Sequence, residues 1–154
     1  MIKINVITNN SKWLSYFKNP NIYVGNQTKN LNKKIQIFKK KNIYCTILLS
    51  DSREIRKLNK KFRNKNKSTD ILSFPFYKKK EFQSRFKKNK EIYLGDIILN
   101  FDKMKNKKDH KNFKLEFNKL WIHGFVHLFG YDHKKDRDFF VMQKVEKKYL
   151  SFLN

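Results

Sequence analysis

Three of the chain's four histidines lie close together, as His123, His127 and His133. Residues four apart on an α-helix project from the same face, so the first two imidazoles are expected to point in one direction. Gly130 is placed to end that helix, because the residue after a helix often adopts the left-handed conformation that glycine tolerates. The chain can then turn back and bring His133 towards the other two. This spacing predicts a helix C-terminal end that gathers three nitrogen ligands.

Three neutral imidazoles suit one divalent metal ion, Zn²⁺ above all. They leave the fourth position of a tetrahedral zinc open to water, which is the arrangement of a catalytic site. Water bound there has a pKa of about 7, so hydroxide is available at neutral pH. Three unrelated core or surface histidines are the alternative, and their clustering in a chain with one other histidine argues against it. That other residue, His110, lies among Lys, Asp and Asn and is predicted to be a solvated loop residue.

The same histidine spacing occurs in zinc proteases of the type H-E-x-x-H-x-x-G-x-x-H, where the glutamate is the general base. Gly124 occupies that position here, so the group that would take the proton from metal-bound water is missing. Glycine inside a helix costs roughly 0.5–1 kcal/mol relative to alanine, so something beside the metal needs the room. A bulky substrate backbone and tight helix packing would each explain it. A zinc metalloprotease-like hydrolase therefore stays an alternative, but a weakened one.

The formal net charge of +24 is large for 154 residues. Such a charge attracts polyanions and releases their counterions on binding. However, the positive charge is nearly all lysine, and Asn, Ile and Phe are also abundant. An AT-rich genome favours these residues at positions that are not constrained by structure or function, so part of the charge can be compositional bias. The charge supports a nucleic-acid partner without proving one. A non-catalytic, ribosome-associated RNA-binding factor is the second alternative.

Several features argue for a cytoplasmic protein with no membrane partner. No stretch reaches the ~18 to 20 apolar residues that cross a bilayer. Residues 1–8 alternate polar and apolar side chains as a strand does, and they lack the pattern of a signal peptide. The single cysteine, Cys45, cannot form an intramolecular disulfide, and its apolar neighbours predict a small buried side chain.

Hydrophobic periodicity predicts a single α+β domain over residues 1–154, a small mixed β-sheet packed with helices. No internal repeat or Gly/Ser/Pro linker divides it. The strands are expected at 2–7, 43–49, 68–76 and 91–99, and the helices at 28–39, after the capping box at 51–54, from about 112 into the histidine segment, and at 136–150. Pro75 suits an edge or strand end, and Gly95 suggests a bulge or a close backbone approach. The lysine-rich segment 77–90 has few apolar anchors and is predicted to be a mobile loop.

The segment that carries the histidines resembles the H-G-x-L-H-L-x-G-Y-D-H signature of the YbeY family of bacterial rRNA-maturation endoribonucleases, with Val126 at the leucine position. Residues 58–63 (LNKKFR) and 69–76 (TDILSFPF) resemble the family's L-N-x-x-Y-R and T-D-V-L-S-F-P-F blocks. Residues 94–98 (LGDII) resemble its L-G-D-I-x-I segment. The blocks occur in the family's order, whereas residues 1–40 match only in general layout.

The resemblance implies a metal-dependent endoribonuclease specific for single strands, acting in 16S rRNA 3′-end maturation and ribosome quality control. It implies one divalent metal ion, and it implies that Arg63 and His123 are essential for catalysis. The implied partners are single-stranded RNA or rRNA, the small ribosomal subunit, and ribosome-assembly proteins such as the Era GTPase. Whether water or the RNA 2′-OH is the nucleophile stays open, as does the general base.

Arg63 makes physical sense in that role, because a guanidinium binds phosphate oxygens in a bidentate way and keeps its charge. An arginine that merely interacts with the helix dipole is the alternative. Asp132 is a candidate to orient a ligand imidazole, although a turn or cap role explains it equally well. Asp70 and Asp96 are as well explained by bonds from backbone donors as by catalysis. The segment 74–76 (FPF) could stack on unpaired bases, but core packing is the favoured interpretation.

Overall fold

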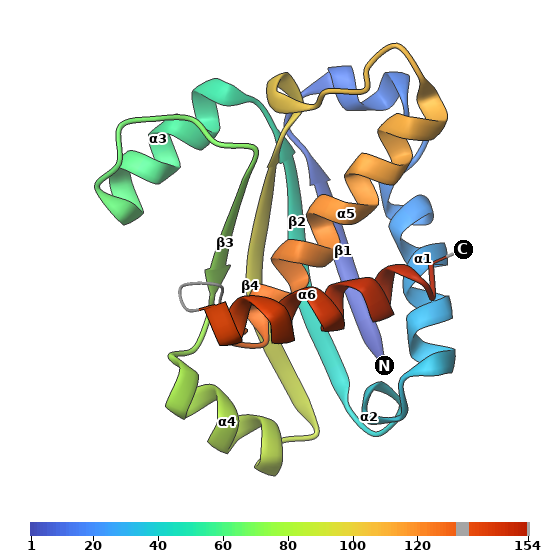
Figure 1. Ribbon diagram of the computed structural model, residues 1–154, viewed down its shortest axis with the longest axis vertical. Helices are drawn as coiled ribbons and strands as arrows, with labels where there is room; N and C mark the ends of the chain where they lie inside the picture. Colours follow the sequence, from blue (N-terminus) through green and yellow to red (C-terminus); the bar gives the residue numbers. More distant parts are fainter. Residues whose placement is uncertain (132–135, 154) are drawn as a thin grey trace.

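A computed structural model describes residues 1–131 and 136–153 of the chain. Within these residues, one mixed sheet contains the strands β1 (Ile2–Thr8), β2 (Asn42–Ser50), β3 (Ile71–Pro75) and β4 (Glu91–Asn100). Their order is β1-β2-β4-β3, as Figure 1 shows. β1, β2 and β4 run parallel, and β3 runs antiparallel to β4 at one edge. The α+β class with a small mixed sheet is thus confirmed.

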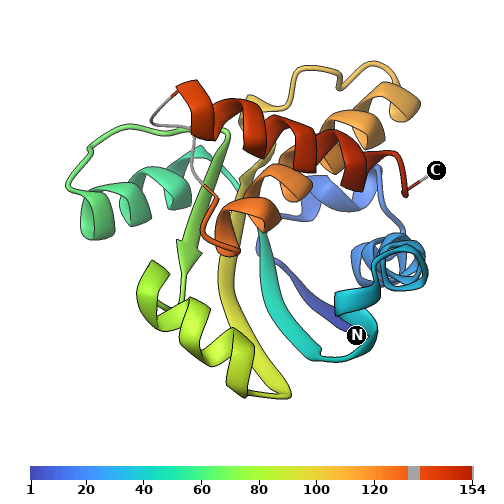
Figure 2. The same cartoon turned by 60° about the horizontal axis from the view of Figure 1, so that its bottom comes forward.

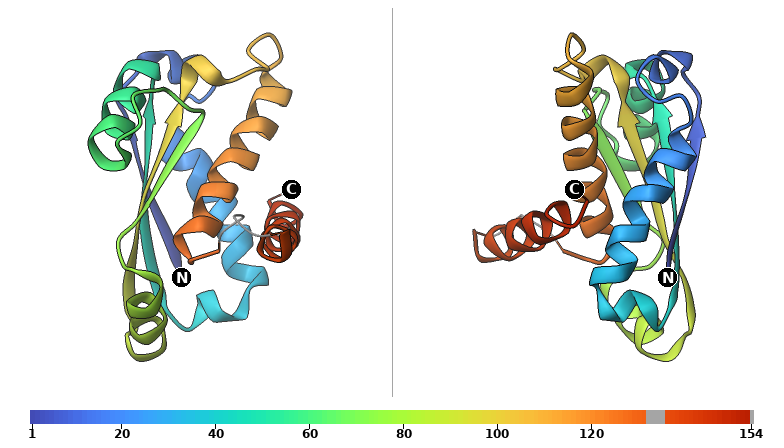
Figure 3. Two further views of the ribbon diagram at one scale, coloured as in Figure 1. Left: turned by 60° about the vertical axis from the view of Figure 1, so that its left-hand side comes forward. Right: turned by 90° about the vertical axis from the view of Figure 1, so that its right-hand side faces the viewer.

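Helices cover the sheet unequally on its two faces. The described helices are α1 (Pro20–Lys34), α2 (Gln36–Lys39), α3 (Ser52–Arg63), α4 (Lys79–Lys88), α5 (His110–Leu128) and α6 (Asp136–Leu150), with 3-10 helices η1 (Ser11–Ser15) and η2 (Phe101–Lys103). Figure 3 shows α1 and α5 on one face of the sheet and α6 packed outside α5. α3 covers part of the other face through Ile55, which packs with Leu72 and Ile98. Of the described helices, none combines the length and apolarity needed to cross a membrane.

The main core lies between the sheet and α5. Alternate residues of β2 are buried, including Ile43, Cys45 and Ile47, as its alternating sequence requires. Cys45 is therefore the buried side chain that its neighbours predict. α5 contributes large side chains such as Phe117 and Trp121, which are fully buried. The helix is consequently fixed along most of its length before it reaches the histidines.

Both ends of α5 are capped. At the N-terminal end the Asp109 carboxylate accepts hydrogen bonds from the N–H groups of Lys111 and Asn112, at 2.8 and 3.2 Å. At the other end Gly130 has φ +83°, and its N–H donates to the His127 carbonyl at 2.9 Å. Gly130 therefore ends the helix in the left-handed conformation that the sequence predicts.

Gly95 allows β3 to approach β4 closely. Its φ is +134°, and a Cβ atom there would lie 2.1 Å from the Phe74 carbonyl oxygen. The pairing of β2 with β4 shifts register at this point, between Tyr44 and Thr46. Pro75 ends β3 at the edge of the sheet, where its missing N–H has no ladder partner to lose. Both sequence predictions are confirmed.

Two predicted segments differ from the structure. The helix expected at 28–39 begins instead at Pro20, and Ile35 in extended conformation separates α1 from α2. The start was missed because it depends on a cap, in which Asn19 accepts from the Ile22 N–H, with proline at the first helical position. Segment 77–90 is not a loop but contains α4, which Figure 2 shows beside the lower end of β4.

Candidate active site

His123 and His127 lie in the last two turns of α5 and face the same way, as their spacing predicts. Their Nε2 atoms are 3.1 Å apart. The two rings are nearly perpendicular, with an interplanar angle of 84° and centroids 4.6 Å apart. The nitrogens therefore converge on one point while the rings avoid each other.

Hydrogen bonds at the opposite ring atoms fix how each imidazole presents its nitrogen. His123 Nδ1–H donates to Glu146 Oε1 at 2.8 Å, and His127 Nδ1–H donates to the Tyr131 carbonyl at 2.9 Å. A carboxylate and a carbonyl only accept, so both Nδ1 atoms carry the proton. With the proton on Nδ1, Nε2 is the ring atom that can bind a metal, and the two Nε2 atoms lie on facing sides of the imidazoles. A cation shared by the two nitrogens would stabilise this arrangement.

The geometry fits a divalent metal ion. Two nitrogens at the Zn–N distance on a tetrahedral ion lie about 3.3 Å apart, close to the spacing of the two Nε2 atoms. Carboxylate and carbonyl acceptors behind the ligand imidazoles are the usual support of a metal site. The described residues contain no group of three His, Cys, Asp or Glu side chains that could hold a metal. His133 and Asp132 lie outside the described residues, so the third ligand stays a prediction.

Glu146 is a residue that the sequence interpretation missed. It lies on α6, its side chain is 22% exposed, and its carboxylate contacts the His123 ring. The amphipathic pattern indicates only its helix face, because Glu146 follows the buried Met142 by four residues. A carboxylate on the inner face of the helix that follows the histidines suits a partner for one of them. Among the described residues Glu146 takes the role that was considered for Asp132.

Arg63 is the last residue of α3 and lies in the same cleft as the two histidines, a cavity of about 1230 Å³. Its Nη2 donates to the Ser73 carbonyl at 2.9 Å. The guanidinium carbon lies 5.5 Å from the centre of the Phe74 ring. The sequence blocks at 58–63 and 69–76 thus meet here, and each fixes the other.

The cleft is basic. Besides Arg63 it is lined by Lys65, Lys78 and Lys79, whereas Asp70 is the acidic residue among its described lining residues. Asp70 accepts from the Thr69 hydroxyl and the Ile71 N–H at 3.0 and 2.9 Å, so it has a local structural role. The excess of cations suits a polyanionic substrate.

The remaining candidates near the cleft divide into structural and exposed residues. Asp96 accepts from the Tyr93 hydroxyl at 2.6 Å and is not part of the cleft lining. Phe74 packs with the small core beneath α3, as expected. Phe76 is 64% exposed, so the core-packing interpretation was wrong for this residue. It follows the last residue of an edge strand, and its ring contacts those of Tyr77 and Tyr93.

Gly124 allows α5 to lie directly on the sheet. A Cβ atom at this position would lie 2.8 Å from Ile97 Cγ2, 2.9 Å from Ile71 Cδ1 and 3.0 Å from Ser73 Oγ. Between the two explanations that the sequence left open, the structure shows tight helix packing. Because Ser73 also holds Arg63, this close approach sets the position of the histidines relative to the arginine.

Comparisons with known proteins identify the family to which a chain with this fold and cleft belongs. Residues 10–154 match the family described as Endoribonuclease YbeY. A protein of that name from Pelagibacter ubique is 43% identical, with 99% of this chain and 97% of the relative aligned. Another from Buchnera aphidicola is 36% identical over 82% of this chain and 83% of the relative. The solution structure of a Thermotoga maritima protein superposes with a TM-score of 0.57 and 28% identity, covering 99% of this chain and 89% of that one.

The family match covers residues 10–154, a range that contains α5 and Arg63, and the Pelagibacter relative aligns over 99% of the chain. The chain belongs to the endoribonuclease YbeY family.

Proposed function

We propose that this protein is a metal-dependent endoribonuclease that cuts single-stranded RNA. The observation that carries the proposal is the convergence of the His123 and His127 Nε2 atoms at 3.1 Å, in a basic cleft that also holds Arg63. The relatives, which are named endoribonucleases, supply the class of substrate. We further propose a cytoplasmic role in 16S rRNA 3′-end maturation and ribosome quality control, with the small ribosomal subunit and assembly proteins such as the Era GTPase as partners.

His123 and His127, with His133 as the proposed third ligand, would hold the metal, most suitably Zn²⁺. When bound, such an ion polarises a phosphate oxygen and lowers the pKa of its water. Glu146 and the Tyr131 carbonyl keep both rings in the tautomer that leaves Nε2 as the ligand atom. The protein's own contribution is therefore to orient the nitrogens before substrate arrives.

Arg63 is suited to hold the scissile phosphate. A guanidinium has five N–H donors, so the contact with the Ser73 carbonyl fixes its position and leaves capacity for a phosphate. The Phe74 ring beneath it restricts the plane of the guanidinium. In this position it would offset the negative charge that develops on the phosphate in the transition state.

The decisive experiment compares the purified protein with single-residue variants by elemental analysis and by cleavage of a single-stranded oligoribonucleotide. We expect His127→Ala to lose both the metal and cleavage, because it removes a ligand. We expect Arg63→Ala to keep the metal and to lose about 100-fold or more in kcat, the effect of removing one charge-stabilising donor. His110→Ala and Arg56→Ala are matched controls, since neither residue lines the cleft.

Each outcome separates the candidate functions. Cleavage that persists in both His127→Ala and Arg63→Ala would show a contaminating nuclease and refute the assignment. RNA or ribosome binding without cleavage, unaffected by metal removal, would indicate a non-catalytic factor. Mass analysis of the product ends then identifies the nucleophile, because a 2′,3′-cyclic phosphate requires attack by the RNA 2′-OH. Extended 16S rRNA 3′ ends in cells depleted of the protein would support the maturation role.

A further inference from the structure

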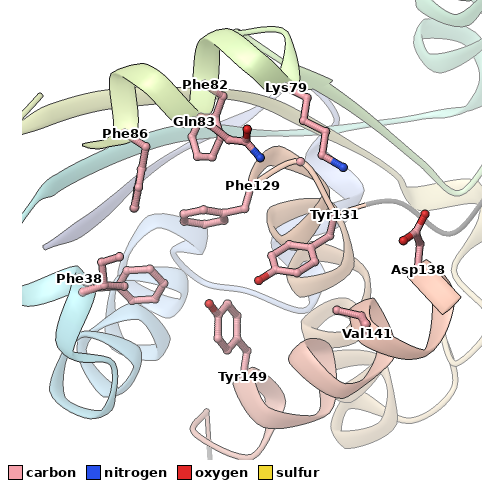
Figure 4. Close-up of a pocket in the computed structure, with 12 residues that line it drawn as sticks. Phe38, Lys79, Phe82, Gln83, Phe86, Phe129, Tyr131, Asp138, Val141 and Tyr149 are labelled. Carbon is pink, nitrogen blue, oxygen red and sulfur yellow. The ribbon is translucent and has the colours of Figure 1, made fainter. Parts of the chain in front are cut away.

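A second pocket of about 490 Å³ lies beside the catalytic cleft, between α2, α4, α6 and the C-terminal end of α5. Figure 4 shows aromatic rings on several sides of it. They come from segments far apart in the sequence. The aromatic lining residues are Phe38, Phe82, Phe86, Phe129, Tyr131 and Tyr149.

The apolar side of the pocket is firmly built. The Phe129 ring lies 5.9 Å from Phe38, 6.0 Å from Phe82 and 5.9 Å from Phe86, measured between ring centres. Phe82 and Phe86, one turn apart on α4, are 5.3 Å from each other. These contacts hold the rings in place, so the pocket has a preformed aromatic side.

The opposite side of the pocket is polar. In Figure 4 the Tyr131 and Tyr149 hydroxyls point towards each other, and Lys79 and Gln83 extend from α4 on the side facing Tyr131. Asp138 adds a carboxylate from α6. The rim thus offers both hydrogen-bond donors and acceptors, with its one lysine balanced by one acid among the described lining residues.

The pocket adjoins the catalytic cleft. Lys79, Phe82, Gly130 and Tyr131 line both cavities. Tyr131 joins them most directly, because its carbonyl accepts from His127 Nδ1 while its side chain borders the pocket. A polymer whose phosphate lies at the histidines therefore reaches the pocket with a neighbouring part of the same chain.

We propose that this pocket receives an unstacked nucleobase of the single-stranded RNA, beside the scissile phosphate. A base is a flat ring with a polar edge, and this pocket pairs aromatic faces with a rim of donors and acceptors. A phosphate would meet too little net positive charge here, and an acyl chain would leave the polar rim unused. The volume lies within the range of small-ligand pockets and admits a purine. The inference rests on the proposed function, since it takes the cleaved RNA as the occupant.

The proposal can be tested kinetically with a variant in which a larger side chain fills the pocket and the cleft is unchanged. Val141 lines the pocket and is 48% exposed on α6, so Val141→Trp fills the space with little effect on the core. Phe140→Trp is the matched control, because Phe140 is 66% exposed and does not line the pocket. With an oligoribonucleotide whose cut site is mapped, we expect KM for Val141→Trp to rise about 10- to 100-fold, the range for losing one stacked base. We expect kcat to change less than about threefold, and the control to match the wild type.

An abasic nucleotide identifies which base enters. Placed at successive positions around the cut site, it should raise KM for the wild type at one position, or two adjacent ones, by a similar factor. The same oligonucleotide should cause no further rise in Val141→Trp, because the pocket is already blocked. An unchanged KM in Val141→Trp, or an abasic effect that persists in full in that variant, would overturn the proposal.

Binding measured without cleavage separates this inference from the function on which it rests. RNA with 2-aminopurine at the identified position is mixed with the wild-type protein in EDTA, and its fluorescence should be quenched as the base stacks on the aromatic rings. Val141→Trp should abolish the quenching that depends on position, and Phe140→Trp should retain it. Quenching without any cleavage in the presence of metal would refute the endoribonuclease assignment alone, and cleavage without quenching would refute the pocket alone.

Discussion

The two ends of α5 use the same kinds of side chain for different purposes. Near its N-terminal end, Phe113 and Phe117 surround the Trp13 indole, with each ring centre 5.9 Å from that of Trp13. All three side chains are fully buried. Near its C-terminal end, Phe129 joins Phe82 and other rings around a pocket of about 490 Å³.

This difference shows how one helix can supply both stability and a site. The indole fills the space between the phenylalanines at the N-terminal end, whereas at the other end the corresponding space stays open beside His127. The filled end anchors the helix, and the rigid helix transmits that anchoring to the histidines. Side-chain substitutions at the filled end should therefore change mainly the stability, and those at the open end mainly substrate binding.

The largest effect is expected at the filled end, for Trp13→Ala. The change leaves a cavity among Phe101, Phe113 and Phe117 and removes the hydrogen bond from Trp13 Nε1–H to the buried Ser50 carbonyl. We expect the free energy of unfolding to fall by about 3–5 kcal/mol, measured by urea denaturation at 25 °C. KM and kcat of the folded fraction should stay within about twofold of the wild type. A loss below about 1 kcal/mol would show that this end is not the anchor.

The pH dependence of the free energy of unfolding tests how far the Tyr149 hydroxyl is shielded from water at the open end. Burial, and next the charge of Tyr131, raise the pKa of the Tyr149 hydroxyl to about 12. The unfolded chain ionises this group near pH 10, so the native state keeps a proton that the unfolded state loses. The resulting stability is fully present below pH 10 and is lost as the pH rises towards 12.

The contribution of Tyr149 is isolated by comparison with Tyr149→Phe, because lysines and other tyrosines titrate in the same range. Between pH 10 and 12 the wild type should lose about 2 kcal/mol more than the variant in free energy of unfolding, measured by denaturant titration at each pH. Parallel stability curves for the two proteins would mean that the Tyr149 hydroxyl is as well solvated as in the unfolded chain.

The sequence predicted those features that depend on local spacing. His123 and His127 share a face because they are four residues apart, and Gly130 ends the helix because of its φ. Pro75 and Gly95 likewise acted through their own backbone preferences. Such features require no knowledge of what lies opposite in the fold.

Contacts between distant segments were not predictable in the same way. The sequence of α4 is mostly polar, and its two apolar anchors, Phe82 and Phe86, both pack against Phe129, the residue that follows α5. Glu146 contacts His123 across 23 residues, and nothing local indicates which carboxylate meets which imidazole. The purpose of Gly124 stayed undecided for the same reason, since the sheet beneath it is remote in sequence.

Gly124→Ala examines how closely the open end of α5 must approach the sheet. The new methyl group would lie within 3.0 Å of side-chain atoms of Ile97, Ile71 and Ser73, so the helix or these side chains must move. Despite the better helix propensity of alanine, we expect a loss of about 1–2 kcal/mol in free energy of unfolding. Because Ser73 positions Arg63, kcat should also fall, measured with the same oligoribonucleotide.

Gly25→Ala in α1 is the matched control, because a Cβ atom there would have no neighbour within 4 Å. Here only the backbone preference acts, and alanine in the interior of a helix should raise the free energy of unfolding by about 0.5–1 kcal/mol with no change in kcat. Opposite signs at the two glycines would show that Gly124 is required for packing and not merely tolerated. If Gly124→Ala were also stabilising and fully active, α5 could shift on the sheet without disturbing the site, and the close approach would not set the distance between His123 and Arg63.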